Sequence, residues 1–131
     1  MAGKRENLSS GSVFEEKFGY SRAVKVGEMV FISGTVGIDY KTGEVSSDPH
    51  EQLRQIVRNF QPSLEKAGAK MADIVQITTY VTEPQIFHDL GPTLKEIFGD
   101  IRPSNAALVV AFPVPDVVVE ISATAIIGAG G

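Results

Sequence analysis

The sequence contains no cysteine, and this absence excludes three kinds of chemistry. Disulfide bridges, thiolate metal sites and a cysteine nucleophile all need a thiol that the chain does not have. A chain without cysteine is compatible with a reducing compartment, so we expect a cytoplasmic protein.

Basic residues are also few, because 12 lysines and arginines stand against 16 acidic residues and give a formal net charge of −4. Phosphate backbones and anionic lipids are captured by clusters of lysine and arginine, and the sequence has no such cluster. We therefore expect neither nucleic acid nor a membrane surface as a partner.

Long apolar runs are missing as well. Stretches such as residues 106–115 are interrupted by prolines and fall short of the ~20 residues that cross a bilayer. The polar N-terminal sequence MAGKRENLSSG lacks the apolar stretch of a signal peptide. With 43% apolar residues, we expect a single domain over residues 1–131, with a loose arm over about residues 1–10 and a frayed tail over residues 128–131.

What is present is a hydrophobic pattern that changes its period along the chain, from the alternation of strands to the spacing of helices. The predicted elements are strands at residues 22–26 and 29–33, a helix from Asp48 to Gly68, a strand at residues 74–81, a helix at residues 84–98, and strands at residues 105–112 and 117–127. This order predicts an α+β domain in which two helices pack on one face of a mixed β-sheet.

Both predicted helices contain signals that place their ends or weak points. Asp48 before a proline is a helix cap, Glu51 is placed to close a capping box, and Gly68 is a stop signal. Pro62 is expected to kink the first helix because proline removes a backbone donor. The Gly-Pro pair that begins at Gly91 marks a weak point in the second helix.

The last predicted strand makes Glu120 a candidate site residue. Odd positions from 117 to 127 are all apolar, whereas even positions mix valine and isoleucine with Glu120, Ser122 and Thr124. The even face is too apolar for free solvent and too polar for a dry core, and a subunit interface with a wet pocket would satisfy that pattern. The alternative is that Glu120 is an ordinary solvated glutamate on an exposed sheet face.

Other sources of chemistry are weak in this sequence. The two histidines, His50 and His88, have no spacing to each other or to acidic residues that resembles a metal site. We therefore expect no metal. No phosphate-cradling glycine loop, dinucleotide motif or nucleophile elbow occurs, so we expect no cofactor. We interpret Ser33 and Gly34 as a strand end where another group approaches the backbone closely.

Four segments match a known family in the order and spacing of their glycines, turn residues and strand patterns. They are GYSRAVKVGEMVFISGTVGIDYKTGEV, LEKAGAKMADIVQITTYVT, IFGDIRPSNAALVV and VVVEISATA, within about residues 19–125. Together they resemble the YjgF, or Rid, family of reactive-intermediate deaminases, also called L-PSP endoribonucleases. The resemblance implies a chorismate-mutase-like fold and a homotrimer whose sheets face inward around a central barrel. It also implies that clefts between subunits bind small-molecule ligands.

The resemblance assigns roles to four residues that match the family pattern. In the family, the residue at Tyr20 borders the pocket, those at Ser33 and Gly34 present backbone groups to the ligand, and that at Glu120 orients the hydrolytic water. A carboxylate in a half-dry cleft holds and partly deprotonates a water. Glu120 is therefore the candidate catalytic residue.

Three positions depart from the family pattern. Asn105 stands where the deaminases have an arginine that holds the substrate carboxylate, Ala107 replaces a small polar residue, and Gly91 aligns with an asparagine. Losing a charge-assisted pair costs roughly 1.5–3 kcal/mol. All three remain candidate ligand-facing positions, and Arg102, shortly before Asn105, is the candidate substitute anchor.

These observations predict a divergent family member that binds a small metabolite between subunits and hydrolyses an imine or enamine with a glutamate-oriented water. The missing arginine argues against the standard 2-imino acid reaction. One alternative is a noncatalytic ligand-binding or chaperone-like trimer, which the lost polar residues favour. A second alternative is an endoribonuclease or translation inhibitor, which the acidic composition disfavours.

Overall fold

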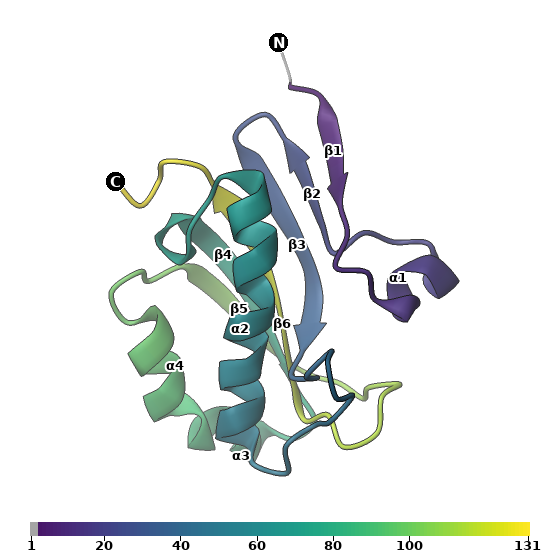
Figure 1. Cartoon of the computed structure of the whole chain (residues 1–131). Coiled ribbons are helices and arrows are strands. Elements are labelled where there is room, and N and C mark those ends of the chain that lie inside the picture. Colours follow the sequence, from purple (N-terminus) through teal and green to yellow (C-terminus); the bar gives the residue numbers. More distant parts are fainter. Residues whose placement is uncertain (1–2) are drawn as a thin grey trace.

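The computed structural model describes residues 3–131, which form one six-stranded sheet with α2 and α4 on the same face (Figure 1). The strands are β1 (Arg5–Leu8), β2 (Ala23–Val26), β3 (Met29–Val36), β4 (Ile74–Val81), β5 (Ser104–Val109) and β6 (Val119–Ile126). The helices are α1 (Val13–Phe18), α2 (Pro49–Ala67), α3 (Pro84–Asp89) and α4 (Gly91–Phe98), with a short 3-10 helix η1 (Met71–Asp73). The strand order is β1-β2-β3-β6-β4-β5. Because β4 and β5 are parallel and the other neighbours antiparallel, the predicted α+β class with a mixed sheet is confirmed.

The core forms where α2 crosses the sheet. Leu53, Ile56 and Phe60 on one stripe of α2 are fully buried, in one cluster with Val30 of β3 and Ile121 of β6. Burying a side chain of this size contributes roughly 1.5–3 kcal/mol. The helical spacing of these residues therefore both predicts α2 and fixes it to the sheet.

The predicted hairpin between β2 and β3 is confirmed. Val26 pairs with Met29, and Gly27 takes a φ of 58°, which glycine adopts without strain. Strand β3 runs beyond the predicted end at residue 33, and its register against β6 shifts between Ile32 and Thr35. This irregularity is a bulge at Ser33-Gly34, and it bends the strand where the functional candidates gather.

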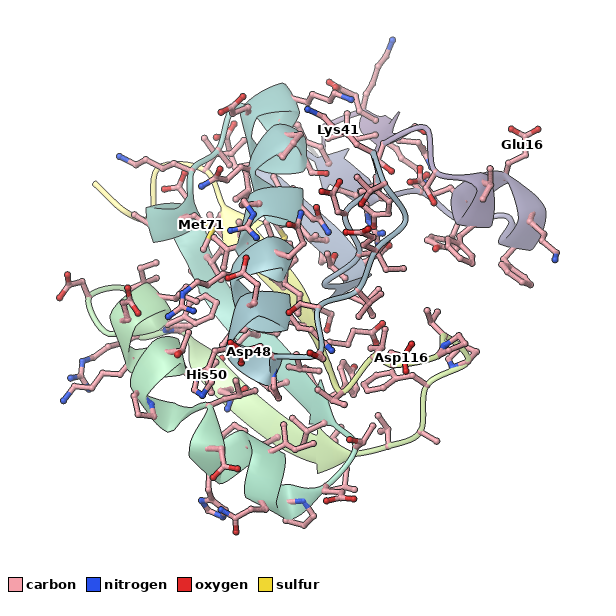
Figure 2. All side chains as sticks on the ribbon, turned by 60° about the horizontal axis from the view of Figure 1, so that its bottom comes forward. Glu16, Lys41, Asp48, His50, Met71 and Asp116 are labelled. Carbon is pink, nitrogen blue, oxygen red and sulfur yellow. The ribbon has the colours of Figure 1, made fainter. Side chains whose placement is uncertain are left out.

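Helix α2 begins and ends at the predicted caps. The Asp48 carboxylate accepts a hydrogen bond from the backbone N–H of His50 at 3.0 Å, and Gly68 ends the helix at a φ of 82°. Figure 2 shows Asp48 and His50 at this end of the helix. The capping box expected from Glu51 was wrong, because its carboxylate accepts from Arg58 at 2.6 Å instead. The helix runs unbroken through Pro62, which lies on its exposed side.

The second predicted helix is divided into α3 and α4. The break falls at Leu90, whose ψ of −8° departs from the helical value, directly before the weak point at Gly91. Leu90 is fully buried, so packing holds the break in place. The single helix expected over residues 84–98 is thus two short ones, because a glycine and a proline follow each other there.

Within residues 3–131, both ends are bonded to the rest of the molecule and differ from the loose arm over about residues 1–10 and the frayed tail over residues 128–131 that the sequence predicts. Residues 1–2 of the predicted arm lie outside the described residues. Residues Arg5–Leu8 pair with β2 and extend the sheet, because the outer edge of β2 offers unpaired backbone groups. At the other end, the backbone N–H of Gly130 donates to the buried carboxylate of Asp73 at 2.9 Å. The short helix α1 was not predicted either, and it follows β1 after the connection formed by residues 9–12.

The two faces of the sheet differ as the alternation in the last strand predicts. In β6, Ile121 and Ala123 are buried on the helix side, whereas Glu120 and Ser122 on the other face are half-buried. Strand β5 lies at the sheet edge, and all of its residues are exposed. Both β5 and β6 are shorter than the predicted ranges 105–112 and 117–127.

Candidate functional site

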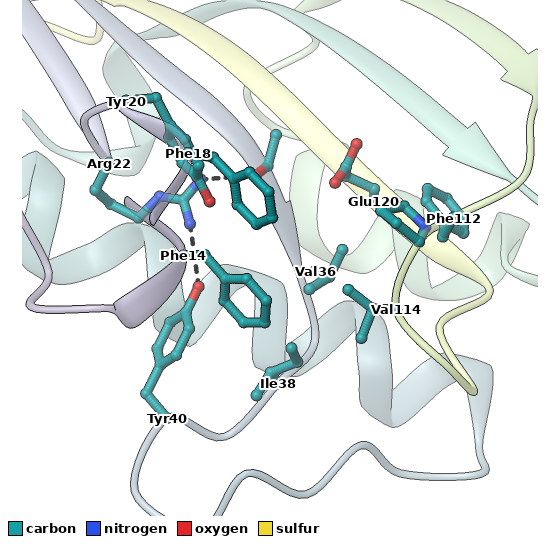
Figure 3. Close-up of a pocket in the computed structure, with 12 residues that line it drawn as sticks. Phe14, Phe18, Tyr20, Arg22, Val36, Ile38, Tyr40, Phe112, Val114 and Glu120 are labelled. Atoms are coloured by element: carbon teal, nitrogen blue, oxygen red, sulfur yellow. Dashed lines mark hydrogen bonds between the residues drawn. The ribbon is translucent and has the colours of Figure 1, made fainter. Parts of the chain in front are cut away.

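A pocket of about 290 Å³ lies at the end of β3, where β6 begins and α1 approaches (Figure 3). We name it the Arg22–Glu120 pocket, after the two side chains in its wall that carry full charges. The other wall residues are aromatic, aliphatic or glycine: Phe14, Phe18, Tyr20, Gly34, Val36, Ile38, Tyr40, Phe112, Pro113 and Val114. The pocket is therefore an apolar chamber with one acid and one base.

Glu120 lies over the backbone of Gly34. It pairs with Val36 across the β3–β6 ladder, and a Cβ atom added to Gly34 would lie only 2.8 Å from its Oε1. Any side chain at position 34 would occupy the space of the carboxylate. The close backbone approach predicted for Gly34 is thus that of the Glu120 carboxylate.

Burial shapes the acid chemistry of Glu120. Desolvation raises its pKa above the ordinary value, and the charge of Arg22 works in the opposite direction. A carboxyl group whose pKa lies closer to neutrality exchanges protons more readily with a bound water. The geometry and the shift together make Glu120 capable of acting as a general base and acid.

Arg22 lies directly before β2 and is only 4% exposed. Its Nη2 donates to the carbonyl of Gly34 at 2.6 Å, and its Nη1 donates to the hydroxyl of Tyr40 at 3.1 Å (Figure 3). Its Cζ lies 5.8 Å from the ring centre of Tyr20, a cation–π distance. Nε is buried and has no hydrogen-bond partner within residues 3–131.

Aromatic rings make up much of the remaining wall. Phe14 and Phe18, one helical turn apart on α1, both line the pocket although they are 36% and 64% exposed. Tyr20 follows Gly19, the C-cap of α1, and burial raises the pKa of its hydroxyl while Arg22 opposes that shift. These rings offer a large apolar surface to a ligand.

A second hollow, of about 550 Å³ and more open, lies between α4 and β5. We name it the α4–β5 hollow, and Gly91, Arg102 and Asn105 line it. Asn105 accepts a hydrogen bond from the hydroxyl of Thr79, which is fully buried, at 3.0 Å. Arg102 is exposed and has a positive φ of 51°. Asn105 therefore has a structural task that explains an amide in this strand.

Within one chain, the predicted site residues are divided between these two places. Tyr20, Gly34 and Glu120 line the pocket, whereas Gly91, Asn105 and Arg102 line the hollow. The remaining two candidates line neither. The hydroxyl of Ser33 donates to the carbonyl of Ser21 at 2.7 Å, and Ala107 lies exposed on β5.

Arg22, the base of the pocket, is not among the residues that the sequence singles out. An arginine at the start of a strand has no local signal that shows it is buried, and the one hint was its place beside Tyr20 in GYSRAV. Phe14 and Phe18 are not singled out either, because α1 is too short for a helical period to be recognised.

The histidines take part in packing and hydrogen bonding. His50 Nδ1 lies 2.6 Å from the hydroxyl of Thr93, and His88 packs edge-on against Phe87. Within residues 3–131, no group of three histidine or acidic side chains is placed to hold a metal ion. No helix in the same part of the chain is long and apolar enough to cross a membrane.

The chain is similar in sequence to known proteins. Residues 12–127 match the family model described as Endoribonuclease L-PSP. A RutC family protein of Pyrococcus abyssi is 36% identical over 81% of this chain and 84% of its own length. A 2-iminobutanoate/2-iminopropanoate deaminase of Salmonella typhimurium is 34% identical over 82% of this chain and 86% of its own length.

Solved structures match over nearly the whole chain. A member of the YjgF/YER057c/UK114 family from Mycobacterium tuberculosis is 37% identical with a TM-score of 0.84, covering 95% of this chain and 100% of its own. The YjgF gene product of E. coli is 31% identical with a TM-score of 0.76, covering 92% of this chain and 91% of its own.

Proposed function

The chain belongs to the Endoribonuclease L-PSP family, which is also named the YjgF family, and from this premise we propose a function for the Arg22–Glu120 pocket. The pocket binds a small metabolite, and the chain hydrolyses an imine or enamine bond of that metabolite with a water held by Glu120. The observation that carries the proposal is the half-buried Glu120 carboxylate, which lies over Gly34 in the wall of an apolar pocket.

The reaction needs one group that moves protons. Glu120 accepts a proton from the water as its oxygen adds to the imine carbon, and then gives that proton to the nitrogen. In the resulting carbinolamine, Glu120 next takes the proton of the new hydroxyl group and gives it to the amino group. The carbon–nitrogen bond then breaks, and a carbonyl compound and ammonia leave. The raised pKa of Glu120, caused by burial, suits both steps. The relative from Salmonella typhimurium is named for this type of reaction.

We also propose that the functional unit is a homotrimer in which the α4–β5 hollow of one copy faces the Arg22–Glu120 pocket of the next. The exposed edge of β5 supports this arrangement, because Leu108 and Val109 are 48% and 56% exposed there. A trimer would also unite the divided site residues. Sedimentation equilibrium tests this point, and a monomer at micromolar concentration would contradict it.

A second candidate function is ligand binding without catalysis. It is favoured by the α4–β5 hollow, where the amide oxygen of Asn105 is already bonded to Thr79 and Gly91 has no side chain. Such a protein would bind ligands at the pocket without turnover.

The deciding experiment is hydrolysis of freshly generated 2-iminopropionate and 2-iminobutyrate, measured against the spontaneous rate. We expect the wild type to accelerate release of ammonia, and Glu120→Gln to lower the rate at least ~100-fold, because the amide cannot move the proton. Glu65→Gln, an exposed glutamate on α2, is the matched control. Equal rates for wild type and Glu120→Gln would contradict the hydrolase, and binding without any acceleration would favour the second candidate.

A further inference from the structure

Arg22 is a buried cation that forms no ion pair with any of the described residues. The ion pairs formed within residues 3–131 join exposed or half-exposed residues of α2 and α4, namely Arg54, Arg58, Glu51 and Glu96. Glu15 and Glu120 are close enough for the charge of Arg22 to lower their pKa values, but neither forms an ion pair with it. Burying an unpaired charge is costly, so the free pocket holds a positive charge that an anion would compensate.

The guanidinium group also has unused hydrogen-bond donors. Of its five N–H groups, one goes to Gly34 and one to Tyr40, and the Nε–H is buried without a partner within residues 3–131. Each Nη atom thus keeps one N–H with no protein acceptor in this part of the chain. The unused N–H groups of a guanidinium are charge-assisted donors for the oxygens of a carboxylate.

The position of Arg22 is fixed before any ligand arrives. The carbonyl of Gly34 and the hydroxyl of Tyr40 hold its two Nη atoms, and the ring of Tyr20 lies beside it. An arginine held in this way loses little side-chain freedom on binding. Gly34 touches both charged residues, since its backbone also lies beneath the Glu120 carboxylate.

The rest of the wall would contact an apolar group. Phe14, Phe18 and Phe112 together with Val36 and Ile38 line the pocket, and Figure 3 shows apolar side chains between Arg22 and Glu120. A volume of about 290 Å³ is near the lower limit of ~300 Å³ for small-molecule pockets. A ligand of this size with one anionic end and one apolar end would satisfy both parts of the wall.

We propose that Arg22 is the ligand-anchoring residue of this chain, and that it binds the carboxylate of a small acid whose side chain is aromatic or similarly large and apolar. This inference rests on the proposed function for the location of the reaction, and it adds the class of substrate. The ligand anchor thus lies directly before β2, and neither Asn105 nor Arg102 in the α4–β5 hollow has that role.

The test compares three stable probes by isothermal titration calorimetry. Phenylpyruvate has the carboxylate and the ring, pyruvate lacks the ring, and phenylacetone lacks the carboxylate. We expect wild type to bind phenylpyruvate about 10–100-fold more tightly than phenylacetone, the ratio for one charge-assisted pair, and also more tightly than pyruvate. Equal affinity for phenylpyruvate and phenylacetone would overturn the proposal without any variant.

Variants then locate the anchor. Arg22→Gln is expected to lower phenylpyruvate affinity about 10–100-fold and to leave phenylacetone affinity within about twofold. Arg58→Gln, which changes an exposed arginine of α2 in the same way, is the matched control. A folded Arg22→Gln protein with unchanged affinity would overturn the proposal, and so would a loss seen with Arg102→Gln instead.

Two further variants cover the case in which Arg22→Gln does not fold, as circular dichroism and thermal unfolding would show. Arg22→Lys keeps the charge but not the paired donors, and Tyr40→Phe releases one Nη atom. We expect Arg22→Lys to weaken phenylpyruvate selectively, and Tyr40→Phe to do so to a smaller extent. If neither changes the ratio between phenylpyruvate and phenylacetone, the anchor is not Arg22.

Different results would contradict the Arg22 anchor and the proposed hydrolysis. Glu120→Gln should abolish hydrolysis and keep the Arg22-dependent binding of phenylpyruvate. Binding that depends on Arg22 without any hydrolysis would support the anchor and contradict the hydrolase. Hydrolysis that depends on Glu120 with an unchanged KM in Arg22→Gln would support the hydrolase and overturn the anchor.

Discussion

The Arg22–Glu120 pocket and the α4–β5 hollow are built in different ways. In the pocket, a buried arginine and a half-buried glutamate lie on either side of the Gly34 backbone among aromatic rings. The hollow is larger and more open, with an exposed Arg102 and an Asn105 bonded to its own sheet. The carboxyl group with the raised pKa thus lies in the pocket beside the buried Arg22, whereas the polar side chains of the hollow are exposed or bonded within the sheet.

The largest expected effect comes from Gly34→Ala. The new Cβ would lie 2.8 Å from Glu120 Oε1, so the carboxylate must move, and a displacement of that kind can cost ~100-fold in rate. Hydrolysis of 2-iminopropionate measures it. The counterpart in the hollow is Gly91→Ala, whose Cβ would meet no atom within 4 Å, and it should leave the fold intact. Equal rates for Gly34→Ala and wild type would show that Glu120 is not positioned by Gly34.

The next largest effect is expected from Asn105→Arg, which tests whether the α4–β5 hollow faces a ligand. Asn105→Arg adds two parallel donors there, and if the hollow meets the pocket of a neighbouring copy, pyruvate affinity should rise about tenfold or more. Calorimetric titration of pyruvate measures the gain. Gln61→Arg, on an exposed position of α2, adds the same charge elsewhere. No gain from Asn105→Arg would remove any role for position 105 in ligand binding.

A smaller effect concerns the stability of the hollow itself. Asn105→Ala leaves the buried hydroxyl of Thr79 without its acceptor, which should lower the free energy of unfolding by roughly 1–3 kcal/mol. Thr79→Val removes the donor as well. In a double-mutant cycle by urea unfolding, the two changes should couple by about 0.5–1.5 kcal/mol. Additive effects would mean that the hydrogen bond contributes nothing.

The smallest effect is the pH dependence from Glu120. Because burial raises its pKa in the folded state, the native protein holds this proton more tightly than the unfolded chain does. Its contribution to stability is present below the ordinary carboxyl pKa and is lost as pH rises through the folded-state pKa. The free energy of unfolding of the wild type minus that of Glu120→Gln should therefore fall as the pH is raised from about pH 4 to about pH 8.

Arg22 affects the pH at which the stability contribution of Glu120 is lost, a transition that follows the pKa of Glu120. The charge of Arg22 lowers the pKa of Glu120 against the larger effect of burial, so Arg22→Gln should move the transition to higher pH. The pH dependence of unfolding, measured with and without Glu120→Gln in the Arg22→Gln background, checks the direction. A shift to lower pH would contradict the electrostatic coupling across the pocket.

Much of the fold could be predicted because its signals are local. The cap at Asp48, the stop at Gly68 and the stripe of apolar residues between them specify α2 through neighbouring residues alone. The hairpin at Gly27 is equally local, since it depends on a positive φ. Strand β1 and helix α1 could not be predicted, because short elements depend on contacts with the rest of the molecule.

The sequence by itself determined the alternation of strands and helices from β2 to β6, apart from the break between α3 and α4, and the family. It also determined the face of β6 on which Glu120 lies, since hydrophobic period and turn residues act over a few positions. Only the tertiary structure decided that Arg22 is buried against Gly34 and that Asn105 is bonded to Thr79. Both contacts join residues far apart in the chain, and they exist because the sheet brings β2 beside β3 and β5 beside β4. Burial and partners of a polar side chain are properties of that packing, and no local pattern encodes them.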